Sequence, residues 1–528
     1  MTTTSARLPR GMRDLLPDDM RRQQYVTDTL RSVFETFGFE PLQTPALERA
    51  ETLLGKYGPD AERLIYRAGL GDEANLALRY DLTVPLARVC AAADGLPRPF
   101  KRYQIAPVWR GERPQRGRYR EFVQADVDIV GSGSMLADAE IITVVTTALD
   151  RLGFADYAIK LNNRHLLAAL GRYAGVPDPV LPGLYRAIDK LDKIGLDGVG
   201  QELRAVGLPA DLVNWQRQAV GRWLRGQVDR DRLARDLAEA FGNDAPGNAR
   251  DGALAAFLDA LAGYPNGGGD DAAVGAATSA VMATSIDALR RLYPAGGQIP
   301  DGVTNRLLEL LQLRDESRAL LASLGGRLDD PAAREGIGQL AAVLDALDAA
   351  GIPAERYAID VAMVRGLEYY TGTIFETAVT RPPIGSILGG GRYDNLVGLF
   401  GRPLAAVGTS FGVDRLIDVM KEVGLFPPAV GAPAAQVLVA LFDPAMSAAA
   451  VGLATRLRSA DIRTTMLFEP DRLGDQIRFA LERGIPLVAI IGPDEAAAGV
   501  VALRDLGTKT QVTVPLPEVA ERARVLLG

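Results

Sequence analysis

The chain has 528 residues, of which 48% are hydrophobic and 24% are charged, and it carries a formal net charge of −7. This length and composition predict a globular protein of roughly two to four domains. The acidic balance excludes binding of nucleic acid through bulk positive charge, so any such binding would need local basic patches.

Cysteine and histidine each occur only once, as Cys90 and His165. A single cysteine excludes an internal disulfide and a multi-cysteine zinc site. A single histidine excludes any metal site with two histidines, and a serine or cysteine triad would have to use His165 itself. Chemistry must therefore come from carboxylates, arginines, tyrosines or a carboxylate-bound metal, and we interpret His165 as a surface or packing residue.

The sequence has no features that predict membrane insertion or secretion. No apolar run approaches the ~20 residues that span a bilayer. The N-terminal segment MTTTSARLPRGMRDLLPDD lacks the apolar core of a secretory signal. We therefore expect a cytoplasmic protein with no membrane partner.

A helix is predicted over residues 18–37, followed by a short strand over residues 39–44. The helix carries an apolar stripe at helical spacing, made of Val26, Leu30, Val33, Phe34 and Phe37. Pro17 precedes the helix and Gly38 ends it, which are the expected start and stop signals. Pro45 ends the strand.

Residues 77–89, ALRYDLTVPLARV, predict another strand because polar and apolar residues alternate. Arg79 and Asp81 would then project from one face. The Asp81 carboxylate and the Thr83 hydroxyl are both able to accept hydrogen bonds from an ammonium group. The alternative is a surface strand in which Asp81 serves only as a cap.

Residues 101–131 predict two antiparallel strands joined by a polar loop. The loop region contains five arginines: Arg110, Arg113, Arg116, Arg118 and Arg120. Guanidinium groups match phosphate oxygens and stay charged at any working pH, so this hairpin is suited to holding a polyphosphate. A solvated basic loop is the alternative. The returning strand places Gln124, Asp126 and Asp128 on one sheet face, which is typical of a substrate-binding floor.

The middle of the chain is predicted to be mostly helical. Residues 135–152 predict a helix and residues 157–161 a strand, and the pattern over 163–350 is helical with many interruptions. The stretch 242–275 is rich in Gly, Ala, Asn and Asp, which indicates weakly packed connections.

Residues 359–376, IDVAMVRGLEYYTGTIFE, predict a strand that leads into a loop with an arginine and two tyrosines. Arg365 offers a cation for a phosphate or carboxylate, and Tyr369 and Tyr370 offer hydroxyls for a polar ring. Gly366 permits a turn that brings the backbone close to a ligand. For the tyrosine pair alone, core packing is the alternative.

Residues 405–420, AAVGTSFGVDRLIDVM, predict a strand, a turn and a helix. Arg415 falls near the N-terminus of that helix, where phosphate binding is favourable. A Pro/Ala-rich linker follows at 426–435. Beyond the linker, apolar strands alternate with helices in a pattern that predicts a mixed α/β domain. The helices of this domain are predicted at 445–459, 472–483 and 516–527.

Several of these stretches resemble one enzyme family. WRGERPQRGRYREFVQADVDIVG resembles motif 2 of the class II aminoacyl-tRNA synthetases in its histidyl form, and RGLEYYTG resembles the histidine-specific motif of that family. Residues 18–45 are similar to motif 1, which builds the dimer interface, and residues 405–420 are similar to motif 3.

The resemblance implies an α+β class II synthetase core, an antiparallel sheet flanked by helices, with a helical insertion and a C-terminal α/β anticodon-binding domain. The implied boundaries are 1–162 and 351–425 for the core, 163–350 for the insertion, 426–435 for the linker and 436–528 for the anticodon-binding domain.

The implied activity is ATP-dependent activation of L-histidine to histidyl-adenylate and its transfer to the 3′ end of tRNA-His. ATP is then a substrate, Mg²⁺ is expected on its outer phosphates, and a homodimer is expected. One alternative is the non-catalytic, synthetase-like regulatory subunit of ATP phosphoribosyltransferase in histidine biosynthesis. The C-terminal domain and the intact motif residues argue against this alternative. A second alternative is a class II synthetase for a different amino acid, and the motif RGLEYYTG argues against that one.

The resemblance also implies roles for individual residues. Arg110, Gln124 and Arg365 would act in catalysis. Histidine would be bound by Asp81, Thr83, Arg110, Gln124, Asp128, Arg365, Tyr369 and Tyr370, with Asp81, Thr83 and Gln124 on the ammonium group and Asp128 and Tyr370 on the imidazole. ATP would be bound by Arg110, Glu112, Arg118, Phe122 and Arg415, with Phe122 on adenine. No metal-ligating residue is assigned.

Overall fold

The computed structural model describes most of the chain. The described residues are 6–57, 62–70, 73–176, 181–188, 191–206, 218–229, 231–233, 235–236, 255, 257–259, 261, 286, 301–364, 369–379, 381–382, 384–441 and 443–528. Arg365 and most of the predicted Gly/Asp-rich connections lie outside these residues. The chain divides into two compact units, Met1–Leu16 with Arg22–Leu425, and Pro17–Arg21 with Phe426–Gly528.

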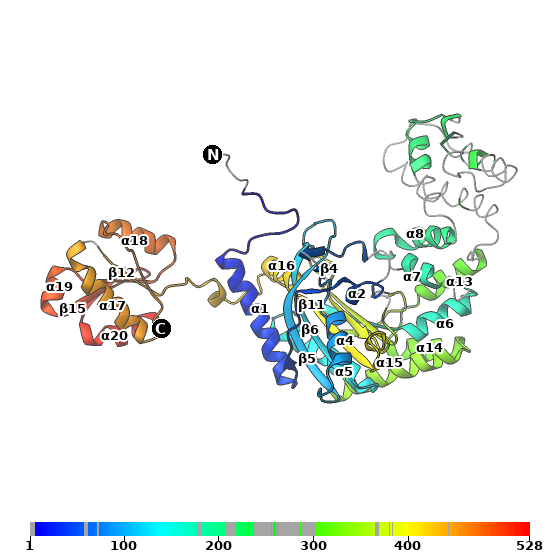
Figure 1. The fold of residues 1–528 in the computed structure, drawn as a ribbon, viewed down its shortest axis with the longest axis horizontal. Coiled ribbons are helices and arrows are strands. Elements are labelled where there is room, and N and C mark those ends of the chain that lie inside the picture. The colour runs from blue at the N-terminus through cyan, green and yellow to red at the C-terminus, as the bar shows by residue number, and fades with distance from the viewer. Residues whose placement is uncertain are drawn as a thin grey trace. The chain divides into compact units, whose positions relative to one another are not determined.

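An eight-stranded mixed sheet forms the centre of the larger unit (Figure 1). Its strand order is β1-β5-β6-β11-β10-β9-β7-β8. The strands are β1 Glu40–Pro41, β5 Phe100–Trp109, β6 Glu121–Val130, β7 Tyr157–Asn163, β8 Tyr357–Ile359, β9 Thr373–Val379, β10 Ser386–Arg392 and β11 Ala406–Gly412. The six inner strands run antiparallel to their neighbours, and the edge strands β1 and β8 pair parallel.

The predicted hairpin at 101–131 is confirmed as β5 and β6, which pair over ten residues each. Alternation along β6 places Gln124, Asp126 and Asp128 on one face, with Ala125 and Val127 on the other. All five of these side chains are buried. Burying carboxylates on a strand costs stability, so their presence indicates a functional role. The face that carries them also carries the candidate site.

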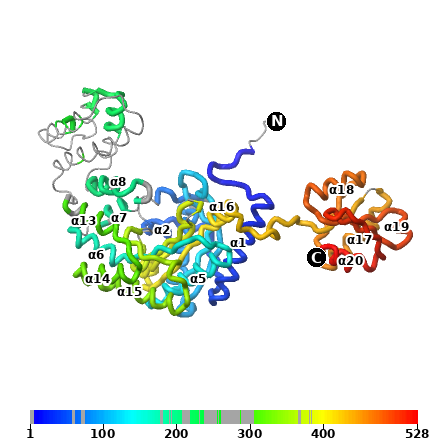
Figure 2. Tube along the Cα trace, turned by 180° about the vertical axis from the view of Figure 1, so that it is seen from behind, coloured from blue at the N-terminus to red at the C-terminus, as the bar shows by residue number. Residues whose placement is uncertain are grey.

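The opposite face of the sheet is covered by helices. The Phe34 ring of α1 (Pro17–Thr36) packs against Tyr103 of β5 and Phe411 of β11, with ring centroids 5.7 and 5.8 Å apart. Helix α5 (Met135–Arg151) packs on β6 and β11, and α15 (Pro331–Ala349) packs on β7, β9 and α5 (Figures 1 and 2). The predicted first helix is confirmed, since Val26, Leu30, Val33 and Phe34 are all buried.

The strand predicted over residues 77–89 is wrong for most of its length. A small sheet of β2 (Leu47–Arg49), β4 (Glu73–Leu78) and β3 (Arg67–Leu70) ends at Leu78, and α4 begins at Thr83. The alternation misled the prediction because Asp81 turns the chain instead: its carboxylate accepts a hydrogen bond from Val84 N at the start of the helix.

Two smaller differences concern Arg79 and the first strand. Arg79 does not share a face with Asp81; it is buried and donates to the carbonyls of Thr44 and Pro107 at 2.7 and 2.9 Å. The strand expected over 39–44 is reduced to Glu40–Pro41, because the proline at its end offers no amide for pairing.

Helices dominate the described part of 163–350, as predicted. They are α6 Arg164–Ala174, α7 Leu181–Ile188, α8 Leu191–Ala205, α13 Asp301–Leu311, α14 Ser317–Arg327 and α15. The apolar sides of α6, α7, α8 and α13 form one buried cluster that also includes Met363, Val364 and Ile374. Elsewhere the larger unit contains α2 Ala50–Leu53, α4 Thr83–Ala92 and α16 Val413–Val423, with short turns at Ala354–Arg356 and Val397–Phe400.

The smaller unit is the mixed α/β domain that the C-terminal sequence predicts. Its five-stranded sheet has the order β13-β12-β14-β15-β16. Its elements are β12 Val437–Ala440, α17 Ser447–Ser459, β13 Thr464–Met466, α18 Leu473–Glu482, β14 Leu487–Ile490, α19 Pro493–Ala498, β15 Val500–Asp505, β16 Gln511–Pro515 and α20 Val519–Leu527. Within the described ranges of both units, no helix combines the length and the apolar character needed to cross a membrane.

Candidate active site

A cavity of about 240 Å³ lies on the face of the large sheet that carries Gln124 and Asp128. Its lining brings together all the predicted site residues that the structure describes: Asp81, Thr83, Arg110, Glu112, Arg118, Phe122, Gln124, Asp128, Tyr369, Tyr370 and Arg415. Arg365 belongs to the undescribed residues, so its position is not part of this geometry. His165 is absent from the lining, and its ring lies 3.8 Å from Glu335.

One end of the cavity is acidic and aromatic. Asp128 accepts a hydrogen bond from the Tyr393 hydroxyl, and Tyr369 packs against Tyr370 and Tyr393 with ring centroids 4.9 and 5.9 Å apart. Burial raises the pKa of Asp128, while the charge of Arg102 and the Tyr393 hydroxyl lower it again. This end therefore combines a carboxylate acceptor with aromatic walls, which suits a polar planar ring.

The middle of the cavity contains two buried acceptors that lack a partner. Asp81 Oδ1 accepts hydrogen bonds from the Tyr57 hydroxyl at 2.9 Å and from Val84 N at 3.0 Å. Among the described residues, neither Asp81 Oδ2 nor Gln124 Oε1 has a hydrogen-bond partner. Gln124 is oriented by its amide, which donates to Ser410 Oγ. Buried acceptors of this kind are suited to a ligand with several N–H donors.

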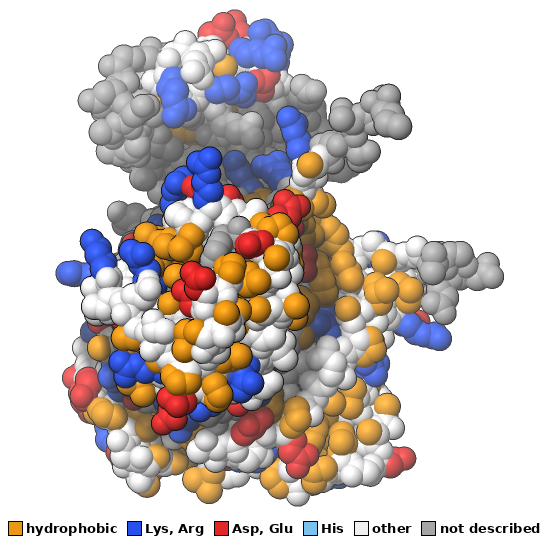
Figure 3. Space-filling view, turned by 90° about the vertical axis from the view of Figure 1, so that its left-hand side faces the viewer, with side chains coloured by type: hydrophobic (Ala, Val, Ile, Leu, Met, Phe, Trp, Pro, Cys, Tyr) orange, Lys and Arg blue, Asp and Glu red, His pale blue; other side chains and the backbone are white. Residues whose placement is uncertain are grey.

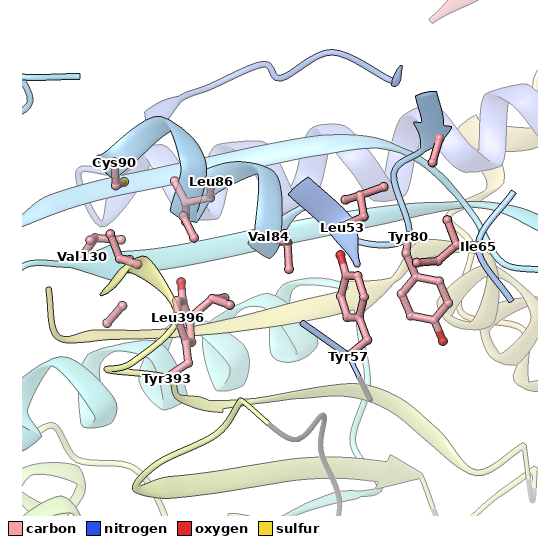
Figure 4. Close-up of a cluster of buried hydrophobic side chains, with 14 of the residues drawn as sticks. Leu53, Tyr57, Ile65, Tyr80, Val84, Leu86, Cys90, Val130, Tyr393 and Leu396 are labelled. Atoms are coloured by element: carbon pink, nitrogen blue, oxygen red, sulfur yellow. The ribbon is translucent and has the colours of Figure 1, made fainter. Parts of the chain in front are cut away.

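The tyrosines that donate hydrogen bonds to Asp81 and Asp128 lie in one hydrophobic cluster (Figure 4). Tyr57 packs beside Tyr80 with ring centroids 4.9 Å apart, and Tyr393 packs with Leu396. Burial is the main reason why the pKa of Tyr57 and that of Tyr393 lie well above the usual value. Both hydroxyls therefore remain protonated and keep donating to Asp81 and Asp128.

The other end of the cavity is lined by arginines. The Arg110 guanidinium lies 4.4 Å from the centre of the Tyr80 ring and 5.1 Å from that of Phe122, and its Nε donates to the Tyr80 carbonyl at 3.0 Å. Arg415, in the first turn of α16, donates to the carbonyls of Gly117 and Ser386 at 3.0 and 2.5 Å. Two guanidinium groups fixed by backbone carbonyls provide positive charge for phosphate oxygens.

Glu112 and Arg118 form an ion pair on the same wall. Burial would raise the pKa of Glu112, but hydrogen bonding to Arg118 and the charges of Arg110 and Arg118 bring it below the usual value. Glu112 is therefore ionised at neutral pH, and the pair provides both an acceptor and donors at the arginine-lined end.

Sequence reasoning missed Tyr57, Tyr393, Ser410 and Arg102 as parts of this site. Only Tyr393 carried a local signal, because it follows the glycine run of GSILGGGRYD. Tyr393 and Ser410 line the cavity, whereas Tyr57 and Arg102 contact its residues Asp81 and Asp128 from outside the lining. The predicted floor of Gln124 and Asp128 is thus completed by residues that only strand register brings into place.

A mixed sheet flanked by helices, with acidic residues and arginines at opposite ends of a pocket on one face, is the catalytic core of a class II aminoacyl-tRNA synthetase. The family model for histidyl-tRNA synthetase matches residues 11–263 and 267–416, and the model for the anticodon binding domain matches residues 436–526. The chain belongs to the histidyl-tRNA synthetase family.

Relatives of similar length agree with this assignment. The chain is 38% identical to the histidine–tRNA ligase of Gloeobacter violaceus, over 96% of both proteins. It is 36% identical to that of Aeropyrum pernix, over 99% of this chain and 98% of the relative. The crystal structure of histidyl-tRNA synthetase from Nostoc sp. PCC 7120 superposes with a TM-score of 0.68 at 27% identity, over 99% of this chain and 100% of that one.

Proposed function

We propose that this chain activates L-histidine with ATP and transfers the histidyl group to the 3′ end of tRNA-His. The observation that carries the proposal is the pair of buried, unpartnered acceptors Asp81 Oδ2 and Gln124 Oε1, stated for the described residues. An α-ammonium group has three donors and satisfies both. The Thr83 hydroxyl lines the same part of the cavity.

The acidic and aromatic end fits the imidazole. A neutral imidazole has one N–H donor and one acceptor nitrogen. Asp128 accepts from the N–H, while a hydroxyl of the tyrosine pair Tyr369 and Tyr370 donates to the other nitrogen. An amino acid without ring nitrogens would leave Asp128 Oδ2 buried without a hydrogen-bond donor, and this cost is the basis of selectivity.

Activation joins a carboxylate oxygen of histidine to the α-phosphorus of ATP. The bond from that phosphorus to the oxygen bridging to the β-phosphate breaks, and pyrophosphate leaves. The protein contributes positioning and charge stabilisation rather than covalent chemistry. Arg110 is held between the ammonium site and the arginine-lined end, so it is suited to contact both the carboxylate and the α-phosphate. We assign Arg365 to the α-phosphate as well, on the basis of the family motif.

The remaining wall residues fit the rest of the nucleotide. Phe122 offers a ring face to adenine, and Glu112 and Arg118 offer an acceptor and donors to its polar edge and ribose. Arg415 lies at the start of a helix, where the helix N-terminus and the guanidinium both favour the outer phosphate.

Mg²⁺ fits this site as an ion that enters bound to ATP rather than as one held by protein ligands. In the described residues no group of three or more His, Cys, Asp or Glu could hold a metal. Glu112 is engaged by Arg118. Mg²⁺ would therefore take most of its ligands from phosphate oxygens and water, and it would neutralise phosphate charge.

In the second step, the terminal hydroxyl of tRNA-His attacks the carbonyl carbon of the adenylate, and AMP leaves. The anticodon-binding domain, proposed as 436–528 after the linker 426–435, would hold the other end of the tRNA. Figure 3 shows Lys and Arg side chains in small groups among acidic and hydrophobic ones on the face it presents. This supports contact through local patches rather than through net charge, which is −7.

The remaining features of the proposal come from the family. We propose a homodimer built on the motif 1 region, a cytoplasmic location, a catalytic core of 1–162 with 351–425, and a helical insertion over 163–350.

Pyrophosphate exchange into ATP, without tRNA and with each of the twenty amino acids in turn, tests the first step. Exchange with histidine alone is the expected result, followed by charging of tRNA-His with labelled histidine. Exchange with another amino acid would contradict the assignment of the pocket. No exchange at all would favour the regulatory subunit of ATP phosphoribosyltransferase.

A further inference from the structure

A buried guanidinium lies beside the pocket floor, on the same face of the sheet. Arg102 on β5 is directly opposite Asp128 on β6, and both side chains are inaccessible to solvent. Arg102 Nη2 lies 2.9 Å from Asp128 Oδ2 and donates to the Leu82 carbonyl at 3.2 Å. The approach to Asp128 is a charge contact without hydrogen-bond alignment, so Asp128 Oδ2 keeps its capacity to accept.

Strand packing alone does not explain this arginine. Its Nε and Nη1 atoms are buried and have no acceptor among the described residues. Buried donors without acceptors destabilise a folded protein, and a buried ion pair is often no more stabilising than apolar residues of the same size. An apolar residue at position 102 would therefore stabilise the sheet at least as well. We infer that Arg102 has a role in the site instead.

Asp126 is a second buried carboxylate on the same face, two residues from Asp128. The Ser410 hydroxyl interacts with Asp126 and accepts the Gln124 amide, so Asp126 is linked to the ammonium end of the floor. Two carboxylates thus share the charge of one guanidinium, Arg102.

We propose that Arg102 is a positioning residue for histidine recognition: it keeps Asp128 ionised and in place, so that Asp128 accepts the imidazole N–H, while Asp126 holds the proton that the cluster retains. This inference rests on the proposed function, because it assigns a role within the histidine pocket.

The surroundings of each carboxyl group decide which of the two, Asp126 or Asp128, carries the proton. Burial raises the pKa of both, and the charge of Arg102 lowers both. Asp128 also accepts from Tyr393, which favours its ionised form. Burial raises the pKa of Asp126, and the negative charge of the ionised Asp128 raises it further, so the pair retains its proton on Asp126.

The other titratable or charged groups around Asp128 do not replace Arg102. They are Asp81 ahead of α4, Cys90 on α4, Tyr370 and Tyr393 on the loops around β10, and Arg402, which acts on Cys90. Asp81 adds negative charge, and the tyrosines and the cysteine are neutral. Without Arg102, burial and the negative charge of Asp81 would favour protonation of Asp128. A protonated Asp128 would no longer be an obligate acceptor for the imidazole N–H.

The test is Arg102→Met, assayed by pyrophosphate exchange against histidine and ATP separately at several pH values. Relative to wild type at the same pH, we expect KM for histidine to rise about tenfold or more near pH 7 and to recover to within about threefold near pH 9, because Asp128 ionises again above its raised pKa. KM for ATP should stay unchanged, and Arg102→Lys should restore part of the loss. The double variant R102M/D126N should show the same KM for histidine near pH 7 as R102M, to within about twofold, because Asp126 is already protonated there.

Arg392→Met is the matched control. Arg392 is also buried and pairs with the buried Asp138, but neither residue lines the cavity. Its loss should lower thermal stability without a histidine-specific effect that depends on pH.

Several outcomes would overturn the inference. They are an unchanged KM for histidine in R102M, the same loss at every pH, or equal losses for histidine and ATP. If R102M does not fold, Asp126→Asn decides: because Asp126 already carries a proton near pH 7, the neutral amide should leave KM for histidine within about threefold of wild type, and a rise of about tenfold would refute the proposal. Wild-type protein that exchanges pyrophosphate with no amino acid would instead refute the proposed function.

Discussion

Gly408 and Asp128 lie opposite each other on β11 and β6, and a Cβ atom at Gly408 would come within 1.9 Å of Asp128 Oδ1. Only glycine leaves room for the carboxylate in the place where Tyr393 donates to it. The position of the imidazole acceptor is therefore set by the absence of a side chain on the neighbouring strand.

Gly408→Ala tests this relationship. The added methyl must displace Asp128, so we expect histidine activation to fall by about 100-fold or more, because a displacement of about 1 Å in a site has effects of this size. Pyrophosphate exchange measures it. Gly133→Ala is the control, since its Cβ would meet only the Ala405 side chain at 3.9 Å. Equal activity of G408A and wild type would show that Asp128 is not placed by this contact.

Asp81→Asn tests the ammonium site while keeping the local fold. The amide oxygen can still accept from Tyr57 and Val84, but the negative charge is lost. We expect KM for histidine to rise roughly 10- to 100-fold, since charged hydrogen bonds contribute about 1.5–3 kcal/mol. The melting temperature should stay near that of wild type.

Asp81→Ala should differ from Asp81→Asn in stability. It removes the acceptor for Val84 N and leaves the buried Tyr57 hydroxyl without its partner. The free energy of unfolding should therefore fall by about 1–3 kcal/mol. Thermal denaturation of the two variants side by side measures the difference. A normal KM for histidine in D81N would exclude Asp81 from ammonium binding.

Arg110→Lys tests the arginine-lined end. Lysine keeps the charge but loses the planar fork that is suited to contact two groups at once. We expect kcat of the exchange reaction to fall by about 100-fold, with a smaller change in KM for ATP, because the charge that Arg110 stabilises develops in the transition state. Arg116→Lys is the control in the same loop. Arg116 is 68% exposed and pairs with Glu422 at the surface, so its replacement should change kcat by less than about twofold.

The N-terminus of α15 offers a test of stability with a defined pH dependence. Asp330 accepts from Ala332 N and Ala333 N and pairs with Arg172, and this pairing lowers the pKa of Asp330 to about 2. Asp330→Ala should destabilise the larger unit by about 1 kcal/mol through loss of the cap, whereas Asp330→Asn keeps the cap and should cost less than about 0.5 kcal/mol.

The sign of the pH effect follows from the lowered pKa. The charge of Asp330 stabilises the fold above its unfolded pKa of about 3.9 and loses this contribution as pH falls towards 2. The difference in melting temperature between wild type and D330N should therefore shrink between about pH 4 and about pH 2. A constant difference across this range would assign the effect to packing instead of charge.

Local patterns determined much of the fold from the sequence alone. The period of two in β6 predicted that Gln124, Asp126 and Asp128 share a face, and apolar spacing predicted α1, α5 and α16. These features depend on neighbours within a few residues, so the sequence contains them directly. The family resemblance then named eleven of the residues that line the cavity, and comparison with known proteins confirms the family.

The chain between Leu78 and Thr83 shows where local reading failed. Alternation predicted a strand, but a buried carboxylate at Asp81 caps a helix and accepts from Tyr57, which lies 24 positions away. Such a contact forms only when the two segments pack together. Tertiary structure similarly decided that Arg102 faces Asp128, that Tyr393 reaches it, and that Gly408 leaves space for it. Strand register and close packing fix these relationships, and neither can be read from the residues on one strand.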